Sequence, residues 1–299
     1  MDLHEEGITM GESSYDVKAI DYGANLFTAE ANRIRPKEQL RQFYTQKIGI
    51  ESRMMEGVSI EEMIERMDRG GFEISLLIST KAGPSGTPYT YHMPYQMVAD
   101  VVNKYPHRFR GLAGIDPTMG MKGVRELEYG VKNLGFVGAH LYPHWFGLAP
   151  DHAKYYPFYA KCIELDVPIE MQIGHCLLYT PDYPLRSVGR PITLDTVACD
   201  FPELKLIGIH MGYPWTEEMI SVSYKHPNVY IGADAYAPRH WQESFVNYVN
   251  TWGQDKVLFG SDFPLLDFER IRREVEELGL RPDAKRKFLR DNAKKVFKL

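Results

Sequence analysis

Two residues, His210 and Asp262, each follow a short apolar run, and there a side chain could hold a metal ion or move a proton. His140 lies within a third apolar run, and His175 follows a fourth. Imidazole nitrogens and carboxylate oxygens are the usual ligands of catalytic zinc, and they also transfer protons near neutral pH. We therefore take these four side chains as the first candidates for an active site.

Asp262 has the most informative surroundings of the four. The apolar residues 257–259 predict a buried strand, and an acid delivered at its end is costly unless a cation or a proton partner meets it. The alternative is structural, since Asp262 could cap a helix whose first turn contains Pro264. The functional interpretation makes Asp262 a general base, with His210 and His175 polarising the reacting group.

Aromatic and basic residues near these candidates predict a pocket for a planar acid. Tyr213 and Trp215 follow His210 closely, and large rings beside polar groups can grip an organic ring. The loop 176–190 is long for a compact barrel and carries Tyr179, Arg186 and Arg190. The two arginines are candidates for binding a carboxylate, or they are ordinary solvated surface residues.

The candidates need a scaffold that brings their strands together. Eight apolar runs alternate with helical patterns, at residues 19–26, 72–80, 109–115, 136–142, 167–174, 204–210, 229–234 and 257–262. This alternation predicts an α/β fold, a single (β/α)8 barrel of the TIM type, with a doubly wound open sheet as the alternative. In a barrel the carboxyl ends of the strands share one rim, where Asn25 and Gln172 would join the candidates as substrate-binding residues.

Helix signals support the same organisation. Ser59 and Glu62 form a capping box before an apolar stripe that ends at Gly70-Gly71. A last helix after Pro282 carries apolar residues through Phe297 and is expected to pack on the barrel as an extra C-terminal helix. We predict a polar N-terminal tail over residues 1–16 and one barrel domain over residues 17–299.

Composition excludes several classes of protein. With 44% hydrophobic and 25% charged residues, the 299-residue chain is typical of a folded globular protein. A net charge of −5 gives no electrostatic footprint for nucleic acid or an anionic membrane. We find no signal peptide and no apolar run of membrane-spanning length, which predicts a cytoplasmic protein with a small-molecule substrate.

Several of these segments together resemble the amidohydrolase superfamily, in the amidohydrolase-related branch that includes aminocarboxymuconate-semialdehyde decarboxylase. The segments that carry the resemblance are Ile20-Asp21, Gly135-Phe136-Val137-Gly138, Phe201-Pro202-Glu203-Leu204 with His210-Met211-Gly212, Leu258 through Pro264, and Asn292-Ala293 through Phe297. The resemblance implies a metal held by an H-x-H pair on strand one, histidines on strands five and six, and an aspartate on strand eight. It also implies a homodimer.

The sequence departs from this family pattern at several ligand positions. Gly23 and Asn25 stand where the resemblance places the H-x-H pair, and Gln172 stands at the strand-five histidine. Only His210 and Asp262 remain in place. The alternatives are a metal-free enzyme, which we favour, and a shifted site for one zinc or manganese ion. The ligands of that shifted site would be His140, His175, His210 and Asp262.

The resemblance and the residues together predict a hydrolase that acts on a small carboxylated cyclic or aromatic compound, with Asp262 as general base. Non-oxidative decarboxylation of an aromatic or muconate-type acid is the alternative, since it needs the same groups. A third interpretation is an inactive barrel used for binding or as a scaffold, which the missing H-x-H pair would favour.

Overall fold

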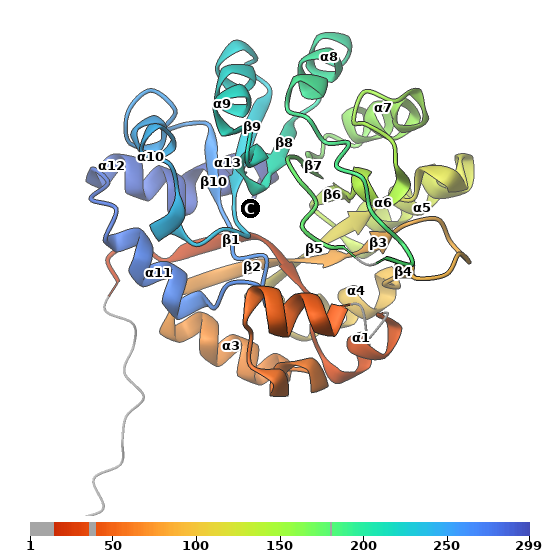
Figure 1. Ribbon diagram of the computed structural model, residues 1–299, viewed down its shortest axis with the longest axis horizontal. Helices are drawn as coiled ribbons and strands as arrows, with labels where there is room; N and C mark the ends of the chain where they lie inside the picture. The colour runs from red at the N-terminus through yellow and green to blue at the C-terminus, as the bar shows by residue number, and fades with distance from the viewer. Residues whose placement is uncertain (1–14, 36–39, 180) are drawn as a thin grey trace, which may run out of the picture.

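The computed structural model describes residues 15–35, 40–179 and 181–299, so most of the predicted N-terminal tail lies outside the described residues. Eight parallel strands form a barrel surrounded by helices (Figure 1), which confirms the predicted fold. In barrel order the strands are β1 (Ala19–Asn25), β2 (Phe72–Ser79), β5 (Phe109–Gly114), β6 (Gly138–Leu141), β7 (Ile169–Gln172), β8 (Leu206–Ile209), β9 (Val229–Ala233) and β10 (Val257–Phe259).

Backbone hydrogen bonds join the first and last strands beyond the end of β10. The amide of Asp262 donates to the carbonyl of Gly23 at 3.0 Å, and the amide of Asn25 donates to the carbonyl of Phe263 at 2.9 Å. These two bonds place Asn25 beside Asp262, although 237 positions separate them in the chain.

Helices follow most strands, and a two-stranded hairpin, β3 (Lys81–Ala82) with β4 (Tyr91–His92), follows β2. Ser59 Oγ accepts a hydrogen bond from the Glu62 amide at 3.0 Å, so the predicted capping box does cap its helix. The helices are α1 (Ala29–Ile34), α3 (Ile60–Arg69), α4 (Tyr95–Lys104), α5 (Met121–Leu134), α6 (Pro143–Phe146), α7 (Tyr156–Glu164), α8 (Ile192–Asp200), α9 (Thr216–Lys225), α10 (Glu243–Asn250), α11 (Phe268–Glu276), α12 (Pro282–Arg286) and α13 (Asn292–Phe297).

Helix α13 packs on the barrel, as the sequence predicts for the extra C-terminal helix, and the structure places it at the amino end. Its Val296 and Phe297 are buried in one apolar cluster with Ile20 of β1 and Leu258 of β10. A Cβ atom added to Gly138, the first residue of β6, would lie only 2.9 Å from the Phe297 ring. Because side chains fill this end, chemistry is left to the carboxyl end.

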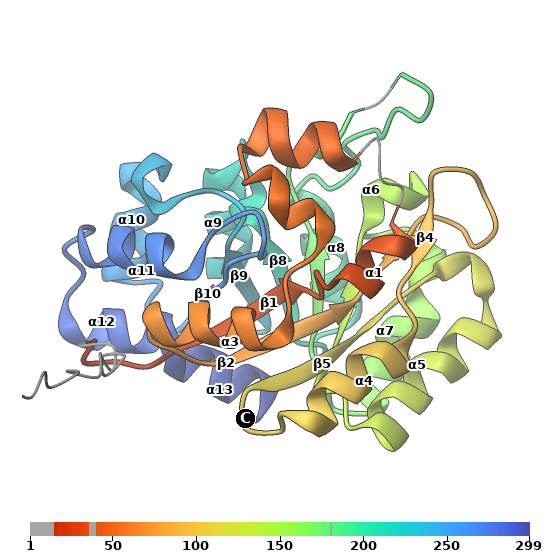
Figure 2. The ribbon, with the colours of Figure 1, turned by 90° about the horizontal axis from the view of Figure 1, so that it is seen from below.

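Two segments stand over the carboxyl end, on the side opposite α13 (Figure 2). One is the π-helical turn Gln42–Ile48, and the other is the loop that joins β7 to α8. Lys47 Nζ donates a hydrogen bond of 2.7 Å to the carbonyl of Leu177, so the segments are in contact. Gly174 starts this loop at φ +95°, and a Cβ atom there would meet the Tyr213 carbonyl oxygen at 2.2 Å, so only glycine fits.

The described helices include none that is both long and apolar enough to cross a membrane.

Candidate active site

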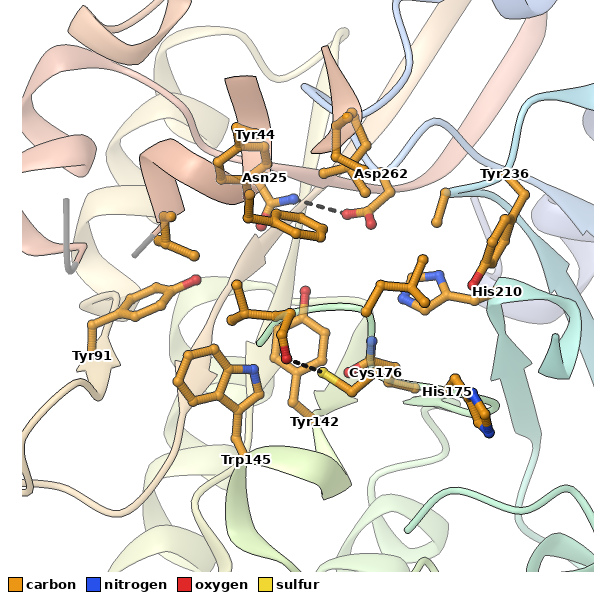
Figure 3. A pocket seen from close by; sticks show the side chains of 18 residues that line it. Asn25, Tyr44, Tyr91, Tyr142, Trp145, His175, Cys176, His210, Tyr236 and Asp262 are labelled. Carbon is orange, nitrogen blue, oxygen red and sulfur yellow. Dashed lines mark hydrogen bonds between the residues drawn. The ribbon is translucent and has the colours of Figure 1, made fainter. Parts of the chain in front are cut away.

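A pocket opens at the carboxyl end of the barrel, with about 730 Å³ of empty space that is partly open to solvent. Four side chains from strand ends form what we call the floor of the pocket: Asn25 of β1, Gln172 of β7, His210 after β8 and Asp262 after β10. Aromatic rings form much of its wall: Phe43, Tyr44, Tyr91, Tyr142, Trp145 and Tyr236 (Figure 3). An aromatic wall of this kind suits a planar ring.

Asp262 is 7% exposed and is held against β1. Asn25 Nδ2 donates to its Oδ1 at 2.9 Å and also to the carbonyl of Phe263 at 3.1 Å. The second bond fixes which end of the Asn25 amide faces the acid, because a carbonyl only accepts. Burial raises the pKa of Asp262 to about 7; the charge of Asp234 adds to this rise, while His210 and the Asn25 hydrogen bond oppose it.

His210 begins directly after β8 and is oriented by an acid from β9. Its backbone amide and its Nδ1 both donate to Oδ1 of Asp234, each at 2.8 Å. Nδ1 therefore carries a proton, and Nε2 is the nitrogen left for chemistry. Burial lowers the pKa of His210, but the charge and hydrogen bond of Asp234, with the charge of Asp262, outweigh it and raise the pKa.

His210 and Asp262 both adopt a backbone conformation that is rare without glycine. The φ angle is 65° at His210 and 48° at Asp262. Such left-handed conformations cost about 1–3 kcal/mol each and cluster at functional sites. Here they lie at the turns that aim the two side chains into the pocket.

A buried acid beneath the floor fixes the turn that presents Asp262. Asp21 accepts hydrogen bonds from the hydroxyls of Ser75 and Ser261, at 2.7 and 2.8 Å, and from the Ser261 amide at 2.8 Å. Asp21 thus connects β1, β2 and the segment after β10. Its role is to position the turn, because its oxygens already have these partners.

Three polar side chains lie on the β6–β7 side of the barrel. His140 Nε2 is 3.8 Å from Glu170 Oε1, and Gln172 follows two residues along β7. Burial lowers the pKa of His140 to about 3. Burial raises the pKa of Glu170 well above its ordinary value, and the charges of Asp234, Asp21 and Asp262 raise it further. His140 is therefore neutral at physiological pH.

The residues at this end of the barrel also fit a divalent metal ion. His210, Asp234 and Asp262 each offer a ligand atom, and these atoms lie within 4.8 Å of one another. One imidazole and two carboxylates are suitable donors, and a ligating histidine often donates its other N–H to a carboxylate, as His210 does to Asp234. Since Nδ1 of His210 is taken, Nε2 and the carboxylate of Asp262 would be the direct ligands.

The structure brings some of the sequence-predicted residues together and separates others. Asp262, His210, His175, Asn25 and Gln172 all line the pocket. His175 is exposed at the edge of the pocket (Figure 3). Its ring centroid lies 4.7 Å from that of Trp215. The four residues of the shifted metal site do not converge. His140 of β6 lies beside Glu170 of β7, and His175 lies at the edge of the pocket.

The predicted substrate-binding residues of the loop and rim lie outside the pocket lining. Arg190 forms a two-pronged ion pair with Glu218, and its guanidinium lies 4.8 Å from the centre of the Trp215 ring. Arg186 is exposed, and the Tyr179 side chain is 70% exposed. Tyr213 reaches the pocket only through Tyr236, whose ring lies 4.7 Å away. Among the described lining residues there is no arginine or lysine.

Sequence reasoning missed Asp234, Glu170 and the aromatic wall. Asp234 ends the predicted strand 229–234, so the rule that selected His210 and Asp262 could have selected it. Glu170 is an acid inside the apolar run 167–174, which is itself a signal of a buried functional group. The wall residues Phe43 and Tyr44 had no such signal, because they come from a connection far from the strand ends.

Comparison with known proteins assigns the chain to a family. A family model described as Amidohydrolase matches residues 76–299. The chain is 26% identical over 293 residues to gamma-resorcylate decarboxylase from Polaromonas sp. strain JS666, which covers 83% of this chain and 86% of that protein. It is 32% identical over 143 residues to 2-keto-4-carboxy-3-hexenedioate hydratase from Sphingobium sp., over 40% of each protein.

Solved structures show the same fold. An uncharacterised TIM-barrel protein from Bordetella bronchiseptica matches with a TM-score of 0.80 and 24% identity, over 94% of this chain and 99% of that one. A 5-carboxyvanillate decarboxylase from Novosphingobium aromaticivorans, complexed with manganese and 4-hydroxy-3-methoxy-5-nitrobenzoic acid, matches with a TM-score of 0.69 and 18% identity, over 97% and 100%. The family match, over most of the barrel, shows that the chain belongs to the amidohydrolase family.

Proposed function

We propose that this protein is a non-oxidative decarboxylase of a small aromatic acid. One observation carries the proposal: the carboxyl group of Asp262 and the imidazole of His210 meet on the floor of a pocket whose wall is largely aromatic (Figure 3). A ring held by that wall would present its substituents to a proton donor and to an oriented imidazole. The similarity to gamma-resorcylate decarboxylase supports the same reaction class.

In the proposed reaction Asp262 is the acid. Its carboxyl group gives a proton to the ring carbon that bears the substrate carboxylate. The bond from that carbon to the carboxylate then breaks, its electron pair returns to the ring, and carbon dioxide leaves. Asp262 regains a proton from water, so the cycle needs no oxidant or reductant. Asp262 therefore acts first as a proton donor and then as a base that takes a proton from water. The second role is the one expected from the sequence.

His210 would hold the acidic side of the substrate. Asp234 supports the protonated, positively charged form of the imidazole, and Nε2 can donate to a carboxylate or ring hydroxyl. In the alternative in which Nε2 of His210 and the carboxylate of Asp262 are both unprotonated, a divalent ion held by these two residues would supply a Lewis acid for the same oxygens. This assignment gives the pocket a cationic group, which its described lining residues otherwise lack.

Hydrolysis is the main expectation from the sequence, but the residues at the floor of the pocket support it less well than decarboxylation. A hydrolase of this family needs an activated water, and the resemblance assigns that task to a metal with strand-one ligands. Gly23 has no side chain to offer, and the Asn25 amide nitrogen is bonded to Asp262 and Phe263. Decarboxylation needs a proton donor held next to the ring carbon, and it does not need an activated water.

The test is release of carbon dioxide from a panel of hydroxybenzoic acids, with and without added Mn²⁺, by the wild-type protein and by Asp262→Asn. We expect turnover of at least one compound and a loss of at least about 100-fold in the variant. A wild-type protein that leaves the whole panel unchanged but opens a lactone or cyclic amide would contradict the proposal and restore the hydrolase.

A further inference from the structure

A buried arginine lies behind the aromatic wall of the pocket, at the end of helix α1. Arg35 follows α1 directly and is only 5% exposed. Its Nη1 donates a hydrogen bond of 2.9 Å to Oδ1 of Asn32, three residues earlier. The amide nitrogen of Asn32 donates in turn to the carbonyl of Met55 at 3.3 Å, which fixes the orientation of this amide. The guanidinium group is therefore held in a defined position.

Most of the donors of this guanidinium group have no acceptor. Nε and Nη2 of Arg35 are buried and find no hydrogen-bond partner among the described residues. Together these nitrogens form the edge of the guanidinium plane that pairs with two oxygens of a carboxylate or a phosphate. Arginine stays protonated in proteins, so the side chain cannot avoid the cost of burial by losing its charge.

The surroundings of Arg35 stabilise its charge only in part. The rings of Phe27 and Tyr91 have their centres 5.1 and 5.7 Å from Cζ, a distance at which an aromatic ring attracts a cation. Neither ring offers an oxygen to Nε or Nη2. In the part of the chain that the structure describes, Arg35 forms no ion pair with a carboxylate, although buried charges are normally paired.

Arg35 lines a second cavity, which has about 550 Å³ of empty space that is partly open to solvent. The other charged lining residues are Arg41 and Glu56, which pair with each other at 3.2 Å and are largely exposed. The described lining therefore carries one more positive than negative charge. Of its described residues, this cavity shares only Leu40 with the pocket, so it is a separate space.

We propose that this second cavity is an anion site, in which the Nε and Nη2 edge of Arg35 binds two oxygens of a small oxyanion, a phosphate or a carboxylate. The anion would supply both the acceptors and the negative charge that the buried guanidinium group lacks. The inference does not depend on the proposed reaction, because the cavity is separate from the floor of the pocket.

The anion site would also be coupled to the aromatic wall. Tyr44 and Tyr91 line the pocket, and both are labelled in Figure 3. Burial raises the pKa of each hydroxyl group, and the positive charge of Arg35 opposes that rise. A bound anion would neutralise this charge, so it would make the two hydroxyl groups less acidic.

The experiment is a titration of the full-length protein with sodium phosphate and, separately, with sodium acetate, at an ionic strength kept constant with sodium chloride. Binding is followed by isothermal titration calorimetry and by the melting temperature. The proteins are the wild type, Arg35→Met and the matched control Arg33→Met, whose arginine is exposed on α1. We expect wild type and control to bind at least one of the two anions and to melt higher with it. Arg35→Met should bind that anion at least tenfold more weakly and lose the melting shift.

Wild-type affinity in Arg35→Met overturns the proposal, as does a wild-type protein that binds neither anion. His210→Gln is titrated in parallel: loss of binding in that variant alone would place the anion in the pocket and also overturn the proposal. If Arg35→Met does not fold, Arg35→Lys replaces it and should still weaken binding, because an ammonium group cannot pair with two oxygens as the planar guanidinium does. Unchanged affinity in Arg35→Lys counts against the proposal. Binding is measured without substrate, so a failure leaves the carbon dioxide assay to decide the reaction separately.

Discussion

The side-chain amide of Asn25 donates a hydrogen bond of 2.9 Å to Oδ1 of Asp262 and so joins the first strand of the barrel to the acid that follows the last. The resemblance places a metal-binding histidine at Asn25. In this chain the residue instead orients the acid and favours its ionised form. Asn25 therefore influences the pKa of Asp262 as well as the position of its carboxyl group.

Asn25→Ala should lower kcat about tenfold or more, because a hydrogen bond to a charged group is worth about 1.5–3 kcal/mol. Removing the donor should also raise the pKa of Asp262 further, so the descending limb of the pH profile should move to higher pH. The measurement is kcat against pH for both proteins. A variant with the wild-type limb would show that this bond does not act on Asp262.

Asp262→Asn should retain the fold and lose at least about 100-fold in kcat, since the amide has nearly the same shape but cannot donate the required proton. Metal content is measured on the same samples by elemental analysis. Loss of activity at unchanged metal content identifies a proton-transfer role. Loss of both would identify Asp262 chiefly as a ligand.

The rate should fall as pH rises through about 7, because the pKa of Asp262 is raised to about 7 by burial and the proposed acid must be protonated. The raised pKa of Asp262 also makes the stability of the protein depend on pH. With an ordinary value of 3.8, the carboxyl group contributes stability that is fully present below about pH 4 and is lost as pH rises to about 7. Asp262→Asn should remove this component from melting temperatures measured between pH 4 and 8. Equal pH slopes in the two proteins would contradict the raised pKa.

Dialysis against a chelator should strip any bound ion, because Gly23 removes one strand-one ligand and Asn25 is committed to Asp262. Added Mn²⁺ should then restore whatever activity the ion supports. The check is elemental analysis before and after dialysis. Stoichiometric zinc or manganese that survives the chelator would be incompatible with such a weak site.

Gly23→Ala should be nearly neutral, because the added Cβ would lie 3.5 Å from Glu170 Oε1 and 3.7 Å from Ile78 Cδ1, both ordinary contacts. Gly23→His, which restores the family residue, should destabilise the protein by about 1–3 kcal/mol, since Glu170 and Ile78 face the space that the ring would need. Denaturant unfolding of both variants measures this. A stable histidine variant would mean that Glu170 can move aside.

The barrel was predictable because its strands are short apolar runs separated by helical stripes, and each predicted run contains an observed strand. His210 and Asp262 were predictable for the same reason, since a strand end in a barrel fixes where a side chain lies. Arg190 shows the limit of that reasoning. Its partner Glu218 lies 28 positions away on α9, and no local pattern reveals that the pair forms.

The interior of the barrel was harder to predict than its rim. The carboxylate of Glu170 on β7 faces Gly23 on β1, where a Cβ atom would lie 3.5 Å from Oε1. Such contacts between distant positions appear only when the strands are assembled. The aromatic wall from residues 42–48 depends likewise on the path of a connection over the pocket.

Helix α13 places Val296 and Phe297, almost the last residues of the chain, inside the apolar cluster at the amino end of the barrel. The apolar side chains at this end therefore stay uncovered until α13 has docked, and a folding intermediate without α13 would expose Ile20, Leu76 and Leu258, which favours aggregation.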